Sequence, residues 1–355
     1  MPLATCNYWL NLFKLLRRDD LLLPLAAAYY PTMRCNLNCA YCEDFGAQRN
    51  DQAGPDVSFD EALRVLGAIR VVADSLILTG GEPLLYPHID ELIARARRDL
   101  RFRQITVLSN GLLLSQHEDI LPLIDRLVIS LDDVEPARWH SLIGVAEQTA
   151  RQIVAHVAAY AARQREFGYR LVANCVLAPQ TLPHARAVLD FCVERGLWVS
   201  FSPQSVHGWP HYDLLVSTAY RAFVRELIAL KKRGAPVVGS LAYLRASIDW
   251  TPYGCFPTLV PRVLANGDLI YPCRAIEKEG SVHGGRVNLL QVGSWREAMA
   301  AAVRTYGNPP RFCASCFQQC YAEPSLMQFQ PLSFLYEWLH FPVSRQAGLA
   351  TFAPG

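Results

Sequence analysis

Short apolar runs alternate with amphipathic, helix-like stretches along most of the chain. Six runs have the length and composition of buried strands, at 28–34, 74–79, 104–109, 126–131, 170–176 and 198–203. Helical spacing is found at 59–72, 88–99, 116–121, 146–167 and 182–195. Strands that alternate with helices are typical of βαβ units and a parallel sheet. Because six units are too few for an eight-stranded barrel, we predict an α/β fold built on a partial (β/α)6 TIM-like barrel.

The alternation stops near residue 234. Beyond it Pro, Gly and Cys become frequent, and two strand-like runs at 259–265 and 268–271 flank Asn266-Gly267. Asn-Gly between two strands is a strong signal for a β-hairpin. We therefore expect a small Cys-rich hairpin and helix domain after the barrel. The predicted divisions are a helical N-terminal extension at 1–27, the barrel at 28–234, the Cys-rich domain at 235–325 and an aromatic-rich tail at 326–355.

Composition narrows the classes of function. The 355 residues are 51% hydrophobic and 19% charged with a formal net charge of +2, so we expect no nucleic-acid partner. No apolar run reaches the roughly 18–20 residues that span a bilayer, and the start does not resemble a secretory signal. We therefore expect a cytoplasmic, reducing location, in which the eleven cysteines remain thiols. Metal binding or catalysis is favoured over a disulfide framework.

The first cysteine cluster follows the first predicted strand. Cys35, Cys39 and Cys42 have the spacing C-x3-C-x2-C. Thiolates suit iron–sulfur clusters, and three of them can hold a [4Fe–4S] cube whose fourth iron stays open to a small molecule. One alternative is zinc, although structural zinc usually takes four local ligands. A buried stripe on a helix also fits the spacing, but Asn36 and Asn38 are poor residues for a helix interior.

This motif resembles the signature of the radical S-adenosylmethionine (SAM) superfamily, with Tyr41 as the aromatic residue before the last cysteine. The resemblance covers residues 28–205 as a fold. It implies that Cys35, Cys39 and Cys42 hold a [4Fe–4S] cluster. It also implies that the amino and carboxylate groups of SAM chelate the open iron.

Gly80-Gly81-Glu82-Pro83 ends the second predicted strand, at the end of the barrel where sites are built. The two glycines allow close backbone approach to a ligand, and Glu82 adds an acceptor. An ordinary turn is the alternative. The motif resembles the one that binds the methionyl amino group in radical SAM enzymes, and we expect Gly80, Gly81, Glu82 and Pro83 to contribute to cofactor binding.

Later strand ends offer further cofactor contacts by the same resemblance. The candidates are Asn110, Ser130 in Ser130-Leu131-Asp132, and Asn174. Turn and capping chemistry is an equal alternative for each. The Arg-Gly that relatives have after the fourth strand is missing, and Arg138 is a candidate substitute.

Five cysteines near the C-terminus form a second constellation: Cys255, Cys273, Cys313, Cys316 and Cys320. Their order resembles the SPASM and twitch extensions of radical SAM enzymes, which hold auxiliary [4Fe–4S] clusters. Five thiolates cannot fully ligate two cubes, so we expect one auxiliary cluster. The first four match the twitch order best, Cys320 could replace one of them, and a zinc site is the alternative. Cys175 and Cys192 are expected to be core thiols, and Cys6 has no partner at metal spacing.

The resemblance implies a common first step, in which the reduced cluster cleaves SAM to methionine and a 5′-deoxyadenosyl radical. That radical removes a hydrogen atom from the substrate, and an electron donor such as flavodoxin or ferredoxin is needed. Only 34 residues precede Cys35, too few for a leader-binding domain, so we expect a small-molecule or lipid-like substrate. The alternatives are a peptide maturase that forms a cross-link or epimer, and a non-enzymatic iron–sulfur sensor or electron carrier. Peripheral membrane contact is not favoured, and the sequence identifies no catalytic acid or base.

Polar residues after strand ends or beside the cysteines are candidates for contacts to the substrate. They are Glu43, Asp44, Asp133, Gln204, His207 and His211. The two histidines fit ordinary loop positions as well.

We predict about eight irons per chain after anaerobic reconstitution, because each cube holds four. Replacing Cys35, Cys39 and Cys42 by Ala should lower the value to about four. Iron and zinc analysis of the purified protein tests this. Iron near one cube in the unaltered chain, together with bound zinc, would reject the auxiliary cluster.

Overall fold

One mixed sheet organises the chain. The computed structural model describes residues 2–19, 21–278, 287–309 and 316–341. Within them nine strands pair in the order β11-β10-β9-β1-β2-β3-β4-β5-β6. These strands are β1 (Ala27–Tyr30), β2 (Ser75–Leu78), β3 (Gln104–Ser109), β4 (Arg126–Ser130), β5 (Arg170–Leu177), β6 (Trp198–Pro203), β9 (Arg262–Leu264), β10 (Asp268–Ile270) and β11 (Val287–Asn288). A separate two-stranded ribbon consists of β7 (Ser205–Val206) and β8 (Trp209–Pro210).

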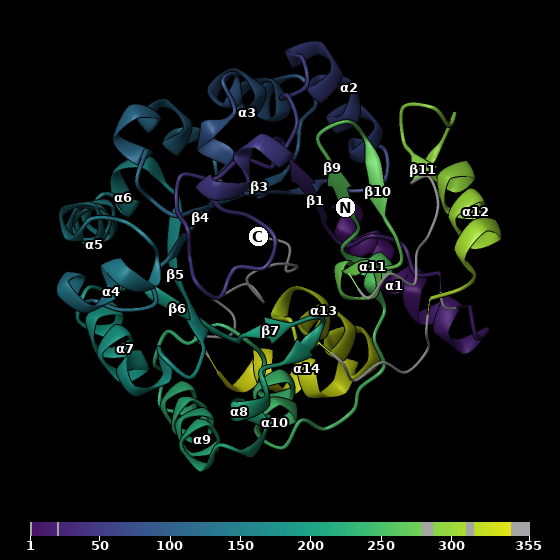
Figure 1. Cartoon of the computed structure of the whole chain (residues 1–355). Coiled ribbons are helices and arrows are strands. Elements are labelled where there is room, and N and C mark those ends of the chain that lie inside the picture. Colours follow the sequence, from purple (N-terminus) through teal and green to yellow (C-terminus); the bar gives the residue numbers. More distant parts are fainter. Residues whose placement is uncertain (1, 20, 279–286, 310–315, 342–355) are drawn as a thin grey trace.

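The six predicted barrel strands all form, and β1 to β6 pair in parallel, each with the next along the chain. The helices between them lie on the outer side of the curved sheet (Figure 1). This arrangement confirms the expected α/β fold with a partial TIM-like barrel.

α-Helices form at four of the five positions predicted within the barrel, and further helices form where none was predicted. In chain order, the α-helices are α1 (Leu3–Leu16), α2 (Phe59–Arg70), α3 (Ile89–Arg98), α4 (Pro136–Leu142), α5 (Glu147–Ala162), α6 (Gln164–Phe167), α7 (Ala185–Glu194), α8 (Tyr212–Val216), α9 (Thr218–Lys232), α10 (Leu241–Ile248), α11 (Arg274–Lys278), α12 (Trp295–Tyr306), α13 (Gln319–Phe329) and α14 (Pro331–His340). The helix expected at 116–121 is wrong, because this region forms two 3-10 segments and contains Pro122, which lacks the amide hydrogen of a helix interior. The helix expected at 146–167 is broken at Arg163 into α5 and α6.

Strand side chains alternate between two environments. On β2, Leu76 and Leu78 are fully buried against the helices, whereas Ile77 between them lines an internal cavity. The same alternation continues around the sheet. The cavity-facing set also includes Thr106, Leu108, Val128, Val172, Asn174, Ser200 and Ser202. The outer face of the sheet therefore forms the hydrophobic core, and the inner face forms a partly polar chamber.

The predicted hairpin is formed by β9 and β10, which pair antiparallel around Asn266-Gly267. Strand β9 also pairs in parallel with β1, with Tyr29 opposite Val263. The hairpin therefore extends the barrel sheet beyond β1, and the division of the chain near residue 235 stays a prediction.

Helix α13 closes the open side of the partial barrel. The side-chain oxygen of Gln319 accepts hydrogen bonds from Ser200 and Ser202 on β6, at 2.5 and 3.3 Å. One residue later, the Sγ atom of Cys320 accepts a hydrogen bond from Arg262 of β9 at 2.6 Å. The first turn of this helix thus joins the two sides of the barrel opening (Figure 1).

Helix α14 is attached through one buried ion pair. Lys231 of α9 lies 3.3 Å from Glu337, and both side chains are almost fully buried. Glu337 also accepts a hydrogen bond from the backbone N–H of Leu241 at 2.7 Å. The opposite face of the helix is apolar and exposed, and it includes Leu332 and Tyr336. These apolar side chains of the predicted aromatic-rich tail therefore do not pack in the core.

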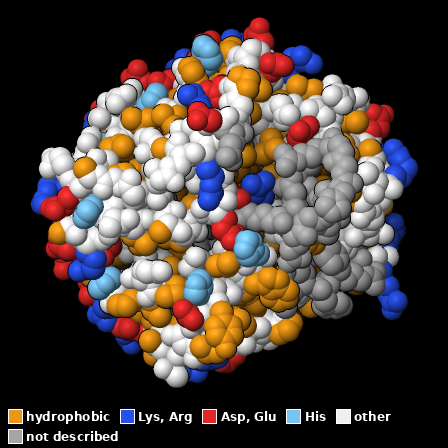
Figure 2. All heavy atoms as spheres, viewed as in Figure 1, with side chains coloured by type: hydrophobic (Ala, Val, Ile, Leu, Met, Phe, Trp, Pro, Cys, Tyr) orange, Lys and Arg blue, Asp and Glu red, His pale blue; other side chains and the backbone are white. Residues whose placement is uncertain are grey.

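The surface shows no concentration of one charge on the face seen in Figure 2, where basic and acidic side chains mix around the periphery of the described residues. No helix within the described ranges has the length and apolar character needed to cross a bilayer.

The buried ion pair gives a stability prediction. Lys231→Met leaves Glu337 buried without its cation, and we expect a loss of about 3–5 kcal/mol in the free energy of unfolding. Adding Glu337→Gln should restore at least half of it, because Gln is uncharged. Urea unfolding of the anaerobic protein measures these changes. Lys232→Met, on the exposed neighbour, is the control and should stay within about 0.5 kcal/mol; equal losses for the two lysines would contradict the prediction.

Candidate active site

The cysteine loop (residues 35–46) follows β1 and lies at the C-terminal end of the barrel strands. It contains no helix, so the alternative of a buried helical stripe is wrong. Cys35, Cys39 and Cys42 all line one cavity of about 210 Å³. The structure thus brings together the three thiols of the first constellation in a space suited to a cofactor.

The loop is held from one side by the segment after α4. The backbone N–H groups of Asn38 and Ala40 donate to the carbonyl oxygens of Ile143 and Leu142, at 2.9 and 2.8 Å. Gly144 follows in a left-handed conformation with φ of +66°, and a Cβ atom there would lie 2.7 Å from the Asn38 carbonyl oxygen. A glycine is therefore needed for this close approach.

Two asparagines hold the loop from other sides. The side chain of Asn50 accepts from the backbone N–H of Cys35 at 2.9 Å and donates to its carbonyl at 3.0 Å. The Asn110 amide, after β3, donates to the Asn36 side chain at 2.6 Å. The first cysteine is thus positioned by backbone hydrogen bonds that leave its thiol available.

Gly80 and Gly81 allow two backbone segments of the protein to pack closely together. A Cβ atom on Gly80 would lie 2.4 Å from the carbonyl oxygen of Thr32, and one on Gly81 would lie 2.0 Å from that of Arg34. The glycines therefore let the end of β2 pack directly against the backbone that leads into the cysteine loop. Both glycines also line the cavity.

The carboxylate of Glu82 is held by hydrogen bonds from within the protein. Its carboxylate accepts hydrogen bonds from the backbone N–H groups of Leu84 and Asn110, at 3.1 and 2.7 Å, and from the Ser109 hydroxyl at 2.9 Å. Burial raises the pKa of Glu82 to about 7, and these three donors oppose that rise. Glu82 and Pro83 do not line the cavity, so their contact with the cofactor stays a prediction.

The remaining predicted cofactor residues lie around the same cavity. Tyr41, Asn110, Ser130 and Asn174 all line it. The Tyr41 hydroxyl donates to the carboxylate of Asp132, which also accepts from the backbone N–H of Val176 at 2.7 Å. Burial raises the pKa of Asp132 to about 6, while the Tyr41 hydrogen bond lowers it.

Burial also raises the pKa values of two of the cysteine thiols. It raises the pKa of Cys35 to about 11 and raises that of Cys39 further, with the charge of Asp132 as the next cause. Because a buried thiolate is costly, these side chains favour the thiol form unless a metal binds them.

Most residues expected to contact the substrate instead join segments of the chain. Glu43 accepts from the backbone N–H of His207 at 2.9 Å, and Asp44 pairs with Arg274 at 3.0 Å. Asp133 accepts two hydrogen bonds from Arg138, at 2.5 and 2.7 Å, so Arg138 is already engaged.

None of the six candidates lines the cavity beside the cysteines or the internal cavity of the barrel. His211 accepts a hydrogen bond from the N–H of Asp213 at the start of α8.

The C-terminal cysteines lie in two settings. Cys255, Cys273 and Cys316 are buried, and Cys320 is exposed and lines the larger cavity; Cys313 lies outside the described residues. Tyr321 lies within electrostatic range of Cys273 and Cys320, and Tyr243 within range of Cys316 and Cys320. Burial raises the pKa of both tyrosines, and these cysteines contribute to the rise. Cys320 thus acts on the same buried tyrosines as Cys273 and Cys316 do.

Cys175 and Cys192 are buried in the core, as predicted. Among the described residues, no three His, Cys, Asp or Glu side chains come close enough to hold a single metal ion. A cube binds each thiolate through a different iron, so its ligands are spread more widely than those of one ion.

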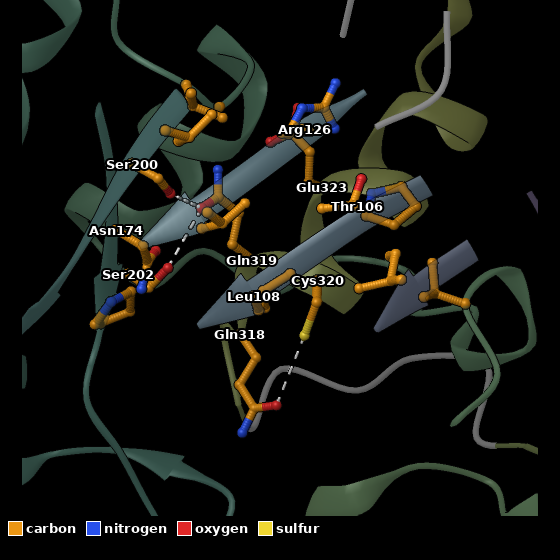
Figure 3. Close-up of a pocket in the computed structure, with 18 of the residues that line it drawn as sticks. Thr106, Leu108, Arg126, Asn174, Ser200, Ser202, Gln318, Gln319, Cys320 and Glu323 are labelled. Carbon is orange, nitrogen blue, oxygen red and sulfur yellow. Dashed lines mark hydrogen bonds between the residues drawn. The ribbon is translucent and has the colours of Figure 1, made fainter. Parts of the chain in front are cut away.

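A larger cavity of about 340 Å³ occupies the interior of the barrel, below the cysteine loop. Leu108, Val128 and Asn174 line both cavities, so the two spaces adjoin. Figure 3 shows Gln319 of α13 pointing to Ser200 and Ser202 across this space, with Arg126 and Thr106 toward the beginning of their strands.

Several site residues were not singled out from the sequence. Asp132 could have been found, because it follows Ser130-Leu131 at a strand end. Asn50 and Gly144 had no such signal. Asn50 contacts Cys35, which is 15 positions earlier, and Gly144 contacts Asn38, which is 106 positions earlier. Gln319 reaches the barrel from a helix far along the chain.

Comparison with known proteins agrees with this geometry. A family profile described as the radical SAM superfamily matches residues 29–192. A Mycobacterium tuberculosis protein named GTP 3′,8-cyclase 2 is 28% identical over 309 residues, covering 79% of this chain and 84% of the relative. GTP 3′,8-cyclase of Mycobacterium sp. strain KMS is 29% identical over 310 residues, covering 79% and 85%.

Solved structures share the fold. SuiB of Streptococcus suis bound to S-adenosylmethionine has a TM-score of 0.60 at 24% identity, covering 78% of this chain and 66% of SuiB, so the match spans slightly less than two thirds of that chain. The enzyme anSMEcpe with bound AdoMet has a TM-score of 0.57 at 14% identity, covering 88% and 97%. The fold implies a [4Fe–4S] cluster and SAM. Residues 29–192 form a radical SAM domain, and the chain is an enzyme.

Proposed function

We propose that the chain cleaves SAM at a cluster held by Cys35, Cys39 and Cys42, and removes a hydrogen atom from a small molecule bound inside the barrel. The observation that supports this most strongly is the shared lining of the two cavities by Leu108 and Asn174. A radical formed beside the cysteines would enter the barrel chamber without crossing solvent.

The smaller cavity fits the cofactor pair. Three thiols face it, the Gly80-Gly81 backbone forms one wall, and Asn110, Ser130 and Asn174 supply polar groups. When bound, the reduced cluster would supply the electron that cleaves SAM to methionine and the radical. The protein's own part is to orient these groups and exclude water. Tyr41 and Asp132 hold the base of the loop, and α13 covers the opening of the barrel.

The chamber fits a small substrate. Its volume of about 340 Å³ lies within the usual range for small-molecule sites. Hydroxyl and amide groups alternate with Val and Leu side chains around its wall, which suits a ligand of mixed polarity. The aliphatic part of the wall is compatible with a lipid-like substrate.

GTP is the first substrate to assay, because the curated relatives are named as GTP 3′,8-cyclases. The charges in the chamber argue for a less anionic ligand. Among the described lining residues, Arg126 and Lys231 are balanced by Glu323 and Glu337, and Lys231 is already paired with Glu337. A triphosphate carries about four negative charges and normally requires several unpaired cations.

We further propose one auxiliary [4Fe–4S] cluster in the C-terminal region. The twitch-like order of the cysteines supports it, together with Cys320, which lines the substrate chamber at the start of α13. Because Cys320 borders the chamber, the cluster would be placed to accept an electron from a substrate radical or to orient the substrate.

The SAM cleavage proposal predicts that the reduced, reconstituted protein releases 5′-deoxyadenosine. Cys39→Ala should reduce the rate at least about 1000-fold, because the cluster loses a ligand and the electron path is lost. Anaerobic assay with chromatographic detection measures the product. Cys6→Ala, on α1, is the matched control and should retain the rate. No product from a chain with an intact first cluster would reject the proposal.

The auxiliary cluster is tested by single substitutions in a Cys35→Ala/Cys39→Ala/Cys42→Ala background, which leaves only the second site. Cys273→Ala, Cys316→Ala and Cys320→Ala should each lower the remaining iron from about four per chain towards zero. Cys192→Ala is the matched control in the buried core and should leave the iron unchanged. Iron retained in Cys320→Ala but lost in the other two would assign Cys255 or Cys313 in its place.

A further inference from the structure

The floor of the barrel chamber carries a cation that forms no ion pair with any described residue. Arg126 is the first residue of β4, at the end of the strands opposite the cysteine loop, and it lines the chamber. Its Nε atom is buried and has no hydrogen-bond partner among the described residues. Its guanidinium also makes no ion pair within this part of the chain.

Carboxylates near Arg126 are already engaged elsewhere. Asp125 pairs with Arg97 and accepts from the N–H of Ile105 at 2.6 Å. Elsewhere in the chamber wall, Glu337 pairs with Lys231. Glu323 accepts from the N–H of Ser240 at 2.8 Å through one oxygen, while its other oxygen is buried without a hydrogen-bond partner among the described residues. Among the described residues no carboxylate forms an ion pair with Arg126, and only the charge of the adjacent Asp125 opposes the fall in its pKa.

A second arginine increases the positive charge. Arg170 is the register partner of Arg126 on β5, and its guanidinium lies 5.1 Å from the ring centre of Trp198. Burial lowers the pKa of Arg126 to about 10, and the charge of Arg170 contributes. Like charges on adjacent strands raise the free energy of the folded chain, so an anion bound between them would stabilise it.

The neighbouring positions suit an oxyanion. Thr106 is the register partner of Arg126 on β3 and also lines the chamber. A hydroxyl beside a guanidinium fork can donate hydrogen bonds to a carboxylate or a phosphate. Figure 3 shows both side chains near the beginning of their strands, away from Leu108 and Asn174.

We propose that Arg126 and Thr106 form an oxyanion subsite on the chamber floor that binds a carboxylate or phosphate of the substrate, and that the charge of Arg170 on the next strand favours the anion. Its assignment to the substrate rests on the proposed function. Ser130, at the cofactor cavity, is four positions after Arg126, which corresponds to roughly 13 Å along an extended strand. The substrate therefore has an anionic group at one end and its reacting C–H bond roughly 13 Å away, near Asn174.

The test uses the full-length, reconstituted protein and two probes at constant ionic strength, inorganic phosphate and butyrate. Thermal unfolding should show saturable stabilisation by at least one probe. Arg126→Gln should weaken the apparent affinity roughly 10- to 100-fold, because charge-assisted hydrogen bonds are lost. Arg126→Lys keeps the positive charge but lacks the planar guanidinium group. Its apparent affinity for the probe should lie between those of the unaltered chain and of Arg126→Gln.

Arg103→Gln is the matched control, since Arg103 is an exposed arginine just before β3. It should bind the probes as the unaltered chain does. A response to phosphate alone would indicate a phosphorylated substrate, and a response to butyrate alone a carboxylate. No saturable response to either probe, or an equal response in Arg126→Gln, would overturn the proposal.

The same measurements on the Cys35→Ala/Cys39→Ala/Cys42→Ala variant separate this inference from the proposed function. The floor is remote from the cysteine loop, so probe binding should persist without the first cluster. Absence of SAM cleavage by the unaltered, reconstituted chain, with probe binding retained, would reject only the function. Normal SAM cleavage without probe binding would reject only the subsite.

Discussion

The alternation of side chains along six parallel strands is the constraint on which the rest of the structure depends. Leu76 and Leu78 must pack against the helices, and this places Ile77 on the inner face. The same alternation on each strand produces an internal chamber. Its lining can include polar side chains, because the outer face of the sheet already forms the hydrophobic core. A slip of one residue in any strand would exchange the two faces.

The opening of the sheet is closed by side chains rather than by further strands. Gln319 contacts β6, Cys320 contacts β9, and the buried pair of Lys231 and Glu337 attaches the following helix. Closure and chemistry are therefore linked, since α13 both completes the chamber wall and carries a cysteine of the second constellation. In the proposed mechanism, one helix would exclude water and position the auxiliary site.

The cysteine loop has little regular structure, and backbone contacts from three distant segments determine its shape. Residues 142–144 and the Asn50 side chain contact the loop, and the Gly80-Gly81 turn packs on the backbone that leads into it; at Gly144 and at this turn only glycine fits. This arrangement leaves the thiols facing the cavity while the backbone polar groups are satisfied.

The sequence by itself determined the strands, their parallel order, the hairpin and the grouping of three cysteines after the first strand, because each depends on local periodicity or on short spacing. It did not reveal that Glu82 is bound by three donors, that Arg138 pairs with Asp133, or that the region before Pro122 forms 3-10 turns instead of a helix. Nor could it place Gln319, Cys320 and Arg126 around one chamber. Those contacts join residues far apart in the chain, and only the closing of the sheet brings them together.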